Sequence, residues 1–376
     1  MYGISKAKLQ PYTQIKMSPK HVTLIHQFVQ NLFQSRLRKT DIRNLSGMIG
    51  SIITVHSPKI SHVARSFSFT GRYDSARKRI VRFLKNPRWC ISQLHILYVQ
   101  WIASLIKKSK YQSIIIDYTF LGGYCILWAA IPFKKRSIPL YSRIIRNPQV
   151  IRRKQKEVLI HLEKDFLYFL RLHLPWDRRW IIVGDRQFGH SRNIGLCRSI
   201  GFEYLFRVKG EVYVSHNKNQ HRIDHLAIKR WRRNVGYQGL SVNLLSIVED
   251  AKDPWYLMTS LKNPTTTKRL YQERMWIEEM FRDMKTEQQL KKKQIRSLNM
   301  MKKLCFAVQL SYIIVLFIGL KAKRSKIIKK KLLGHTKASF VFLAVQTFKH
   351  FSQKFFQFLR KILRDLRLGR AIFDSS

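Results

Sequence analysis

Two apolar runs rich in β-branched residues place the tightest constraint on how this chain can fold. The first reads YQSIIIDYTF and contains Asp117, and the second reads WDRRWIIVGD and ends in Asp185. Continuous runs of this kind are typical of strands that are buried on both faces, as in the sheets of α/β proteins. A carboxylate on such a strand is costly unless it is paired or binds a metal ion. We therefore expect an α/β fold in which both aspartates have a special partner.

Other predicted elements surround these two runs. YCILWAAIPF and the stretch that starts at Arg136 are expected to follow the first run as strands, and a helix over about residues 154–173 is expected before the second. GFEYLFRVKG, EVYVSHN, LSVNLLSIV and WYLMTSL then alternate or run apolar in the way of strands. Asn263-Pro264 and the threonines that follow predict a loop before the next helix.

The stretch YQERMWIEEMFRDMK, from Tyr271 to Lys285, is expected to form one helix, because it is rich in helix formers and contains no proline or glycine. Tyr271, Arg274, Glu278 and Lys285 stand at positions that fall within roughly 60° of each other around such a helix. Charge balancing on a surface helix explains part of this pattern. An acid held among bases also suits a carboxylate that binds a metal ion while its neighbours hold phosphates.

The charge of the chain indicates a polyanionic partner. The 376 residues include 72 Lys and Arg against 21 Asp and Glu, a formal net charge of +51. Such an excess favours nucleic acid, bound through phosphate contacts and counterion release. A ribosome-associated or otherwise generally basic protein is the alternative that charge alone leaves open.

The cysteines and the N-terminus bear on the compartment. Cys90, Cys125, Cys197 and Cys305 lie far apart and form no CxxC pair, which argues against a zinc site and a disulfide framework. A reducing cytoplasm fits best. The first residues, MYGISKAKLQPYTQ, contain no apolar segment of the kind found in signal peptides, and they are expected to belong to a basic arm over residues 1–17.

Several short helices are expected between this arm and the first strand. Their predicted starts are Ser18-Pro19, Thr40-Asp41, Ser57-Pro58 and Asp74-Ser75, each a capping residue or a proline at the first helical position. The last of these helices, SARKRIVRFLKN, has an apolar stripe and an opposite side rich in arginine and lysine. Residues 18–90 therefore predict a helical DNA-binding domain, with an ordinary solvated helix surface as the alternative for the basic side.

Two stretches near the C-terminus are open to more than one interpretation. Leu304 to Leu320 is an apolar run of 17 residues with basic flanks. A membrane span usually needs about 20 apolar residues, so a core helix is favoured and no membrane is expected as a partner. Lys337 to Arg370 resembles an amphipathic basic helix, which fits contact with DNA, a partner subunit or acidic lipid, or simple packing with a solvated face.

The acids gain meaning as a set. Asp117, Asp185 and Glu278 are separated by 68 and then 93 residues, and each stands in an unusual context. Taken alone, Asp117 also fits an acid on a strand that is paired with a cation. Asp185 taken alone also fits a salt bridge with its neighbour Arg186. Two strand aspartates completed by a helical carboxylate offer hard oxygen ligands, which suit Mg²⁺ or Mn²⁺ and not zinc. Two such ions about 3.5–4 Å apart can catalyse phosphodiester displacement.

These residues resemble those of the DDE transposases of bacterial insertion sequences, in the branch marked by a Y-x2-R-x3-E-x6-K signature, the insertion-sequence-four group. Tyr271, Arg274, Glu278 and Lys285 meet every spacing of that signature. IIIDYT resembles the strand block of the family's first aspartate, and RSIPL, from Arg136, resembles its small-residue-Ile-Pro-Leu block.

Two further blocks add to the resemblance, which runs from about residue 60 to residue 320. WYLMTS resembles the block at the end of the family's β-rich insertion. IIVGDRQFG resembles the second aspartate block, usually closer to A-D-R-G-F. Gly184 in place of the alanine and Gln187 in place of the glycine are departures that put the turn after Asp185 in question.

The resemblance implies a fold and a division of the chain. Residues 91–320 would form a ribonuclease-H-like catalytic domain, with a β-rich insertion at about residues 203–262. An N-terminal helical DNA-binding domain over residues 18–90 would precede it, and a basic helical C-terminal region over residues 321–376 would follow.

The resemblance also implies roles for the acids and an activity. Asp117, Asp185 and Glu278 would be the catalytic triad that binds two Mg²⁺ or Mn²⁺ ions. The branch follows a cut-and-paste route through a DNA hairpin, in which a freed 3′ hydroxyl attacks the opposite strand and later joins target DNA. The partners would be double-stranded DNA, as transposon inverted-repeat ends and as target, and a second copy of the chain in a synaptic complex, in a bacterial cytoplasm beside the nucleoid.

Roles for the other signature residues follow in the same way. Tyr271, Arg274 and Lys285 would contact phosphates of the transposon end. Trp255 matches a tryptophan that stacks on a base flipped out at the hairpin, a contact worth about 1–3 kcal/mol per base. A core tryptophan at a strand start is the alternative for Trp255.

Two other functions compete with the transposase. One is a ribonuclease-H-like nuclease or resolvase that cuts DNA without joining it. The other is an inactive DNA-binding protein descended from a transposase, although the retention of all three carboxylates argues against it.

Overall fold

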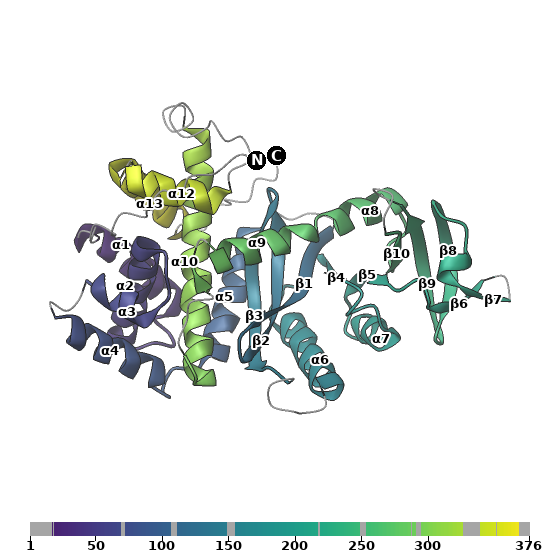
Figure 1. The fold of residues 1–376 in the computed structure, drawn as a ribbon, viewed down its shortest axis with the longest axis horizontal. Helices are drawn as coiled ribbons and strands as arrows, with labels where there is room; N and C mark the ends of the chain where they lie inside the picture. The colour runs from purple at the N-terminus through teal and green to yellow at the C-terminus, as the bar shows by residue number, and fades with distance from the viewer. Residues whose placement is uncertain are drawn as a thin grey trace, which may run out of the picture. The chain divides into compact units, whose positions relative to one another are not determined.

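The computed structural model describes residues 17, 19–68, 72–106, 111–148, 155–216, 219–248, 253–286, 288–290, 295–325, 339–350 and 352–367. It contains two compact units, which we call the helical unit (Met1–Trp89 with Met284–Leu368) and the sheet unit (Cys90–Asp283 with Gly369–Ser376). Figure 1 shows the elements of both. The long apolar helix near residue 310 groups with the N-terminal helices, so the compact units cut across the four predicted domains, and that functional division stays a prediction.

The sheet unit is built on one ten-stranded sheet of order β3-β2-β1-β4-β5-β10-β9-β8-β6-β7. Its strands are β1 (Tyr111–Leu121), β2 (Tyr124–Phe133), β3 (Arg136–Arg146), β4 (Arg179–Gly184), β5 (Glu203–Val208), β6 (Tyr213–His216), β7 (Asn219–Arg222), β8 (Arg230–Tyr237), β9 (Leu240–Ile247) and β10 (Trp255–Thr259). The three strands predicted from Tyr111 onward are confirmed and form an antiparallel meander, β1-β2-β3, which β4 and β5 extend in parallel. The strands of the predicted β-rich stretch continue the same sheet beyond β5.

Helices cover this sheet. They are α5 (Ile91–Leu105), α6 (Gln155–His173), α7 (Ser191–Ser199), the 3-10 turn η1 (Ile223–His225), α8 (Pro264–Gln272) and α9 (Met275–Thr286), the last of which runs on past the end of the unit. In Figure 1, β4 and β5 lie between α6 and α7 on one side and α8 and α9 on the other. The mixed α/β class is as expected.

The predicted continuous helix from Tyr271 to Lys285 is wrong in one respect. Tyr271 lies near the end of α8, and the chain turns at Glu273 and Arg274 before α9 begins. The predicted loop before it is also wrong, because the side chain of Asn263 caps α8 by accepting a hydrogen bond from the Thr266 amide at 2.9 Å, with Pro264 in the first turn. Asparagine as the cap and proline as the first residue begin a helix here and do not break one.

The strand register brings the two aspartates to the same level of the sheet. Ile115 of β1 is the partner of Val183 of parallel β4. Two residues further along each chain come Asp117 and Asp185, so the 68-residue spacing between them equals the offset of the register. Neighbouring parallel strands therefore deliver both carboxylates to one place.

The helical unit is arranged around one long helix, α10. Its members are α1 (Pro19–Phe33), α2 (Lys39–Val55), α3 (Ile60–Arg65), α4 (Tyr73–Lys85), α10 (Leu298–Arg324), α12 (Phe340–His350) and α13 (Ser352–Arg367). Helices α2, α4, α12 and α13 all pack on α10. At Gly319, a side chain would overlap the carbonyl of Phe340, so this glycine permits the close approach of α12.

The apolar and basic C-terminal stretches take defined forms. Within the described residues, α10 is the one helix long and apolar enough to cross a membrane, and its apolar window is 100% buried inside the protein. That burial is the behaviour expected of a core helix. The predicted single helix from Lys337 to Arg370 is instead the pair α12 and α13, while both named ends lie outside the described residues, as does the predicted arm apart from Met17.

Candidate functional site

Asp117 lies on β1 in a largely buried position, with 15% of its side chain exposed. Its Oδ1 accepts a hydrogen bond from the Tyr118 amide at 2.7 Å, and its Oδ2 lies 3.6 Å from Nη1 of Arg274. Burial, and then the charges of Asp185 and Glu278, raise the pKa of Asp117 to about 7 against the opposing effects of Arg274 and of the Tyr118 amide. The charges of Asp185 and Glu278 therefore act on Asp117, and Arg274 contacts both Asp117 and Glu278.

Asp185 is the first residue after β4 and begins a tight turn. Its Oδ1 accepts a hydrogen bond from the Gln187 amide at 2.9 Å. The glycines of this turn have steric reasons: a side chain at Gly184 would meet the Phe188 ring at 2.9 Å, and one at Gly189 would overlap the Arg207 carbonyl. Glycine at position 184, where the family pattern usually has alanine, therefore leaves room for the ring of Phe188.

Arg274 lies at the centre of the site. Its Nη2 donates to Oε1 of Glu278 at 2.9 Å, and its Cζ lies 5.8 Å from the Tyr271 ring centroid. Burial opposes its charge, but Tyr271 and the three acids outweigh burial and raise the pKa of Arg274. The Nε atom of Arg274 is buried and makes no hydrogen bond within the described structure. One guanidinium therefore stands between two of the three carboxylates.

Tyr271 and Trp255 pack against each other. The Tyr271 side chain is 3% exposed and meets the half-buried Trp255 edge-on, at 5.0 Å between ring centroids. Both belong to, or pack on, an apolar cluster that includes Val183 of β4 and Leu257 of β10. Burial raises the pKa of Tyr271, whose hydroxyl lies beside Arg274. Their contacts with DNA stay predictions.

Lys285 is on the same helix as Glu278, seven residues further on. It falls in the helical unit, whereas the other residues of the signature fall in the sheet unit. Its predicted phosphate contact stays a prediction.

The donor set fits a hard cation. It consists of carboxylate oxygens, with no thiolate or imidazole among the predicted ligands, which is the preference of Mg²⁺ and Mn²⁺. As the side chains stand in the described residues, no three Asp, Glu, His or Cys side chains are grouped closely enough to hold a metal ion together. The guanidinium of Arg274 lies between Asp117 and Glu278 and pairs with both.

A buried carboxylate that sequence reasoning missed supports the two aspartates from behind. Glu163 of α6 is 4% exposed and accepts hydrogen bonds from Tyr118 Oη at 3.0 Å, Asn193 Nδ2 at 2.9 Å and Arg192 Nη2 at 2.9 Å. Asn193 also donates to the Phe188 carbonyl at 3.2 Å. Glu163 thus ties the residue after Asp117 to the turn after Asp185.

A second missed group holds α9 in place. Arg136, the first residue of β3, pairs with Glu279 and Asp283 of α9, each at 3.1 Å. Asp283 is 3% exposed, so this pair lies in the interior, where breaking it is costly. The Arg136 pairs therefore anchor the helix that carries Glu278.

A third missed group lies beside Asp185. Asp253 pairs with Arg186 and, at 2.7 Å, with Nη2 of Arg207. The Nε atom of Arg207 is buried and makes no hydrogen bond within the described structure. None of these three groups has a signature in the sequence, because each joins residues that are 29 to 147 positions apart. In the sequence, only the positions of some of these residues next to the predicted aspartate block or on the predicted helix could have indicated a role.

The comparisons with known proteins agree with one part of this picture. A family model described as "Transposase DDE domain" matches residues 161–314, a range that holds Asp185, Glu278 and the whole signature but begins after Asp117. No curated protein matches the chain. The match supports a DDE transposase, an enzyme class whose substrate is DNA.

Proposed function

We propose that the chain is a DNA transposase of the insertion-sequence-four type, which cuts the ends of a transposon and joins them to target DNA. One observation carries the proposal: Arg274 contacts Asp117 and Glu278, and the charges of Asp185 and Glu278 both raise the pKa of Asp117, although the three acids lie far apart in the sequence. In a chain of charge +51, a cluster of acids is the exception. The strand order β3-β2-β1-β4-β5, antiparallel and then parallel, is what a ribonuclease-H-like core requires, and it supports that fold.

Asp117, Asp185 and Glu278 would hold two divalent ions. Bound there, Mg²⁺ or Mn²⁺ would activate water or a 3′ hydroxyl and stabilise the leaving oxygen of a phosphodiester. The chain prepares the site by burying Asp117 and by fixing Asp185 in its turn. Glu278, whose side chain is 45% exposed, is the carboxylate free to move inward.

Arg274 has two roles in this proposal. Without DNA it balances the charge of Asp117 and Glu278, and with DNA it turns to a phosphate beside the reacting bond. Its unsatisfied Nε and that of Arg207 support an anion site, because buried donors without partners call for a missing acceptor. Tyr271 would orient Arg274, Lys285 would bind a further phosphate, and Trp255 would stack on the base flipped out at the hairpin.

The wider reaction follows from the same assignment. Water would nick one strand, the freed 3′ hydroxyl would attack the opposite strand to give a hairpin, and a second water would open it before joining. A homodimer would hold two inverted-repeat ends together in the bacterial cytoplasm.

The decisive experiment measures nicking and strand transfer with Mg²⁺ on pre-cut and uncut ends. We expect Asp117→Ala, Asp185→Ala and Glu278→Ala each to lose activity by about 10³-fold or more, with DNA binding retained. Asp165→Ala is the matched control, because this acid is exposed on α6 of the same unit and, among the described residues, pairs with Arg143 alone. Full activity in the triad variants overturns the proposal.

The same assay separates the competing functions. Cutting without joining of a pre-cut end identifies a nuclease or resolvase. DNA binding with neither reaction in the unaltered chain identifies an inactive binding protein.

A further inference from the structure

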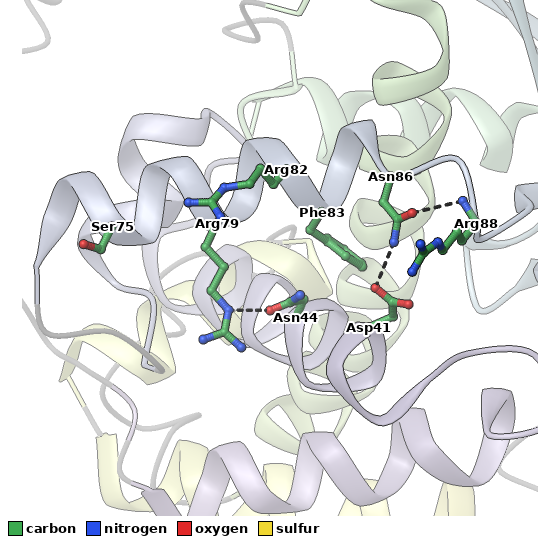
Figure 2. A pocket seen from close by; sticks show the side chains of 8 residues that line it. All are labelled: Asp41, Asn44, Ser75, Arg79, Arg82, Phe83, Asn86 and Arg88. Carbon is green, nitrogen blue, oxygen red and sulfur yellow. Dashed lines mark hydrogen bonds between the residues drawn. The ribbon is translucent and has the colours of Figure 1, made fainter.

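The helical unit contains a polar pocket of about 570 Å³ between α2 and α4. Figure 2 shows that its side chains come from the start of α2, from one side of α4 and from the turn after α4. Arg79, Arg82 and Arg88 line it together with Asn44, Asn86 and Asp41. Three guanidinium groups therefore share one hollow.

The arginines of this pocket lack a carboxylate to balance them. Arg79 donates through Nε to Oδ1 of Asn44 at 2.7 Å, so its orientation is set by a neutral amide. Burial lowers the pKa of Arg79, and the neighbouring charge of Arg43 lowers it further. Within the described residues, none of Arg79, Arg82 and Arg88 forms an ion pair.

The one acid that lines the pocket, Asp41, is hydrogen-bonded to Asn86. Asp41 is 6% exposed, lies in the first turn of α2 and accepts a hydrogen bond from Nδ2 of Asn86 at 3.3 Å. The Oδ1 of Asn86 accepts from the Arg88 amide at 3.0 Å, as Figure 2 shows, and its backbone carbonyl accepts from Lys303 of α10. Asn86 therefore joins Asp41, the turn after α4 and helix α10 through hydrogen bonds.

We propose that this pocket binds a phosphodiester group of the DNA backbone, gripped by Arg79, Arg82 and Arg88. Guanidinium forks match phosphate oxygens in bidentate geometry, and crowded like charges become favourable when an anion enters. The volume exceeds that of a single phosphate ion, which favours a segment of backbone over a free ion. The inference rests on the proposed function only for the choice of DNA as the polyanion.

The test measures DNA binding by the full chain without divalent metal, so that no cleavage occurs. We expect Arg79→Ala and Arg82→Ala each to weaken binding roughly tenfold, and to flatten the plot of log affinity against log salt by about one unit. Arg77→Ala and Lys85→Ala are matched controls, because they remove the same charge from exposed positions of α4 that do not line the pocket. The controls should lose no more than about twofold.

Two further variants separate geometry from charge. Asn44→Ala removes the group that orients Arg79 without changing charge, so it should weaken binding with an unchanged salt slope. Arg79→Lys keeps the charge and loses the fork, so binding should stay well below that of the unaltered chain. Equal losses in Arg77→Ala and Arg79→Ala, with melting temperatures unchanged, overturn the pocket and leave only diffuse attraction.

Competitors identify the phosphate source. Duplex DNA of any sequence should be weakened equally by the pocket variants, while inorganic phosphate and a nucleoside triphosphate should compete poorly. If either small molecule competes strongly, and Arg79→Ala abolishes that competition, the ligand of the pocket is a free phosphate and not the DNA backbone. The pocket is tested by DNA binding without metal, and the triad is tested by nicking and strand transfer. A negative result in one test therefore leaves the other proposal standing.

Discussion

The carboxylate site of the sheet unit and the arginine pocket of the helical unit have opposite charges but the same design. In the first, burial and neighbouring acids raise the pKa of Asp117, and a single arginine stands among the acids. In the second, burial and a neighbouring arginine lower the pKa of Arg79, and a single aspartate accepts a hydrogen bond from the amide of Asn86. Each crowds like charges at a cost to the folded protein. That cost is understandable where a partner of opposite charge completes the site.

The two sites differ in how they are supported. The aspartates stand on adjacent parallel strands, with Glu163 and its three donors behind them. The arginines project from one helix and the turn after it, and the side-chain amide of Asn44 orients Arg79. Chemistry needs side chains held within fractions of an ångström, whereas charge attraction to a backbone tolerates more freedom.

The largest expected effect is the loss of stability in Glu163→Ala, which tests whether Glu163 supports the carboxylate site. Glu163→Ala leaves three donors around an empty buried position, so we expect the free energy of unfolding to fall by about 3–5 kcal/mol. Asp165→Ala, on the same helix with its side chain 55% exposed, should cost less than about 1 kcal/mol. Urea unfolding measures both. Equal losses would mean that Glu163 does not hold the turn behind the aspartates.

The next prediction concerns the charge crowding itself, in the metal-free protein. The pKa of Asp117 rises from 3.8 to about 7 on folding, so the folded chain keeps a proton that the unfolded chain loses. Stability from this group is fully present below pH 4 and is lost as pH rises to about 7, at up to about 1.4 kcal/mol per pH unit. Asp117→Asn should remove that part of the pH dependence in unfolding experiments. An unchanged slope between pH 4 and 7 would show that folding does not raise the pKa of Asp117.

A smaller effect of opposite sign is expected beside Asp185. Asp253→Asn removes the carboxylate that now pairs with Arg186 and Arg207, and both arginines become available to phosphate. We expect DNA to bind several-fold more tightly, with a steeper salt dependence by up to two units. Asp224→Asn is the control, an acid paired with one arginine on the same sheet. Weaker binding by Asp253→Asn would mean that the pair holds the site together instead of competing with DNA.

The smallest effect is expected at Lys285. Lys285→Ala should weaken binding to the transposon end a few-fold and flatten the salt dependence by about one unit. Lys262→Ala, at an exposed position before α8, supplies the control. If the slope of Lys285→Ala matches that of the unaltered chain, Lys285 holds no phosphate, and the anion contacts of the site come from the arginines alone.

Much of the sheet was predictable because its strands are short apolar runs. The β-branched residues around Asp117 and Asp185 can bury both faces only in a sheet covered by helices, and β1 and β4 lie where these runs stand. The break at Glu273 and Arg274 was not predictable, because both residues are compatible with a helix. Its turn is settled by the packing of Tyr271 in the apolar cluster and by the ion pairs of Arg274.

The sequence by itself determined which runs become buried strands and which three of the few acids stand in unusual contexts. Its net charge of +51 indicates a polyanionic partner. Those properties follow from local composition and spacing, which act on each short segment separately. Only the tertiary structure decided which groups meet. The parallel register sets Asp117 level with Asp185, Glu163 joins Tyr118 to Asn193, and Asn86 donates a hydrogen bond to Asp41. Such contacts join residues far apart in the chain, where burial and packing, and not local preference, choose the partners.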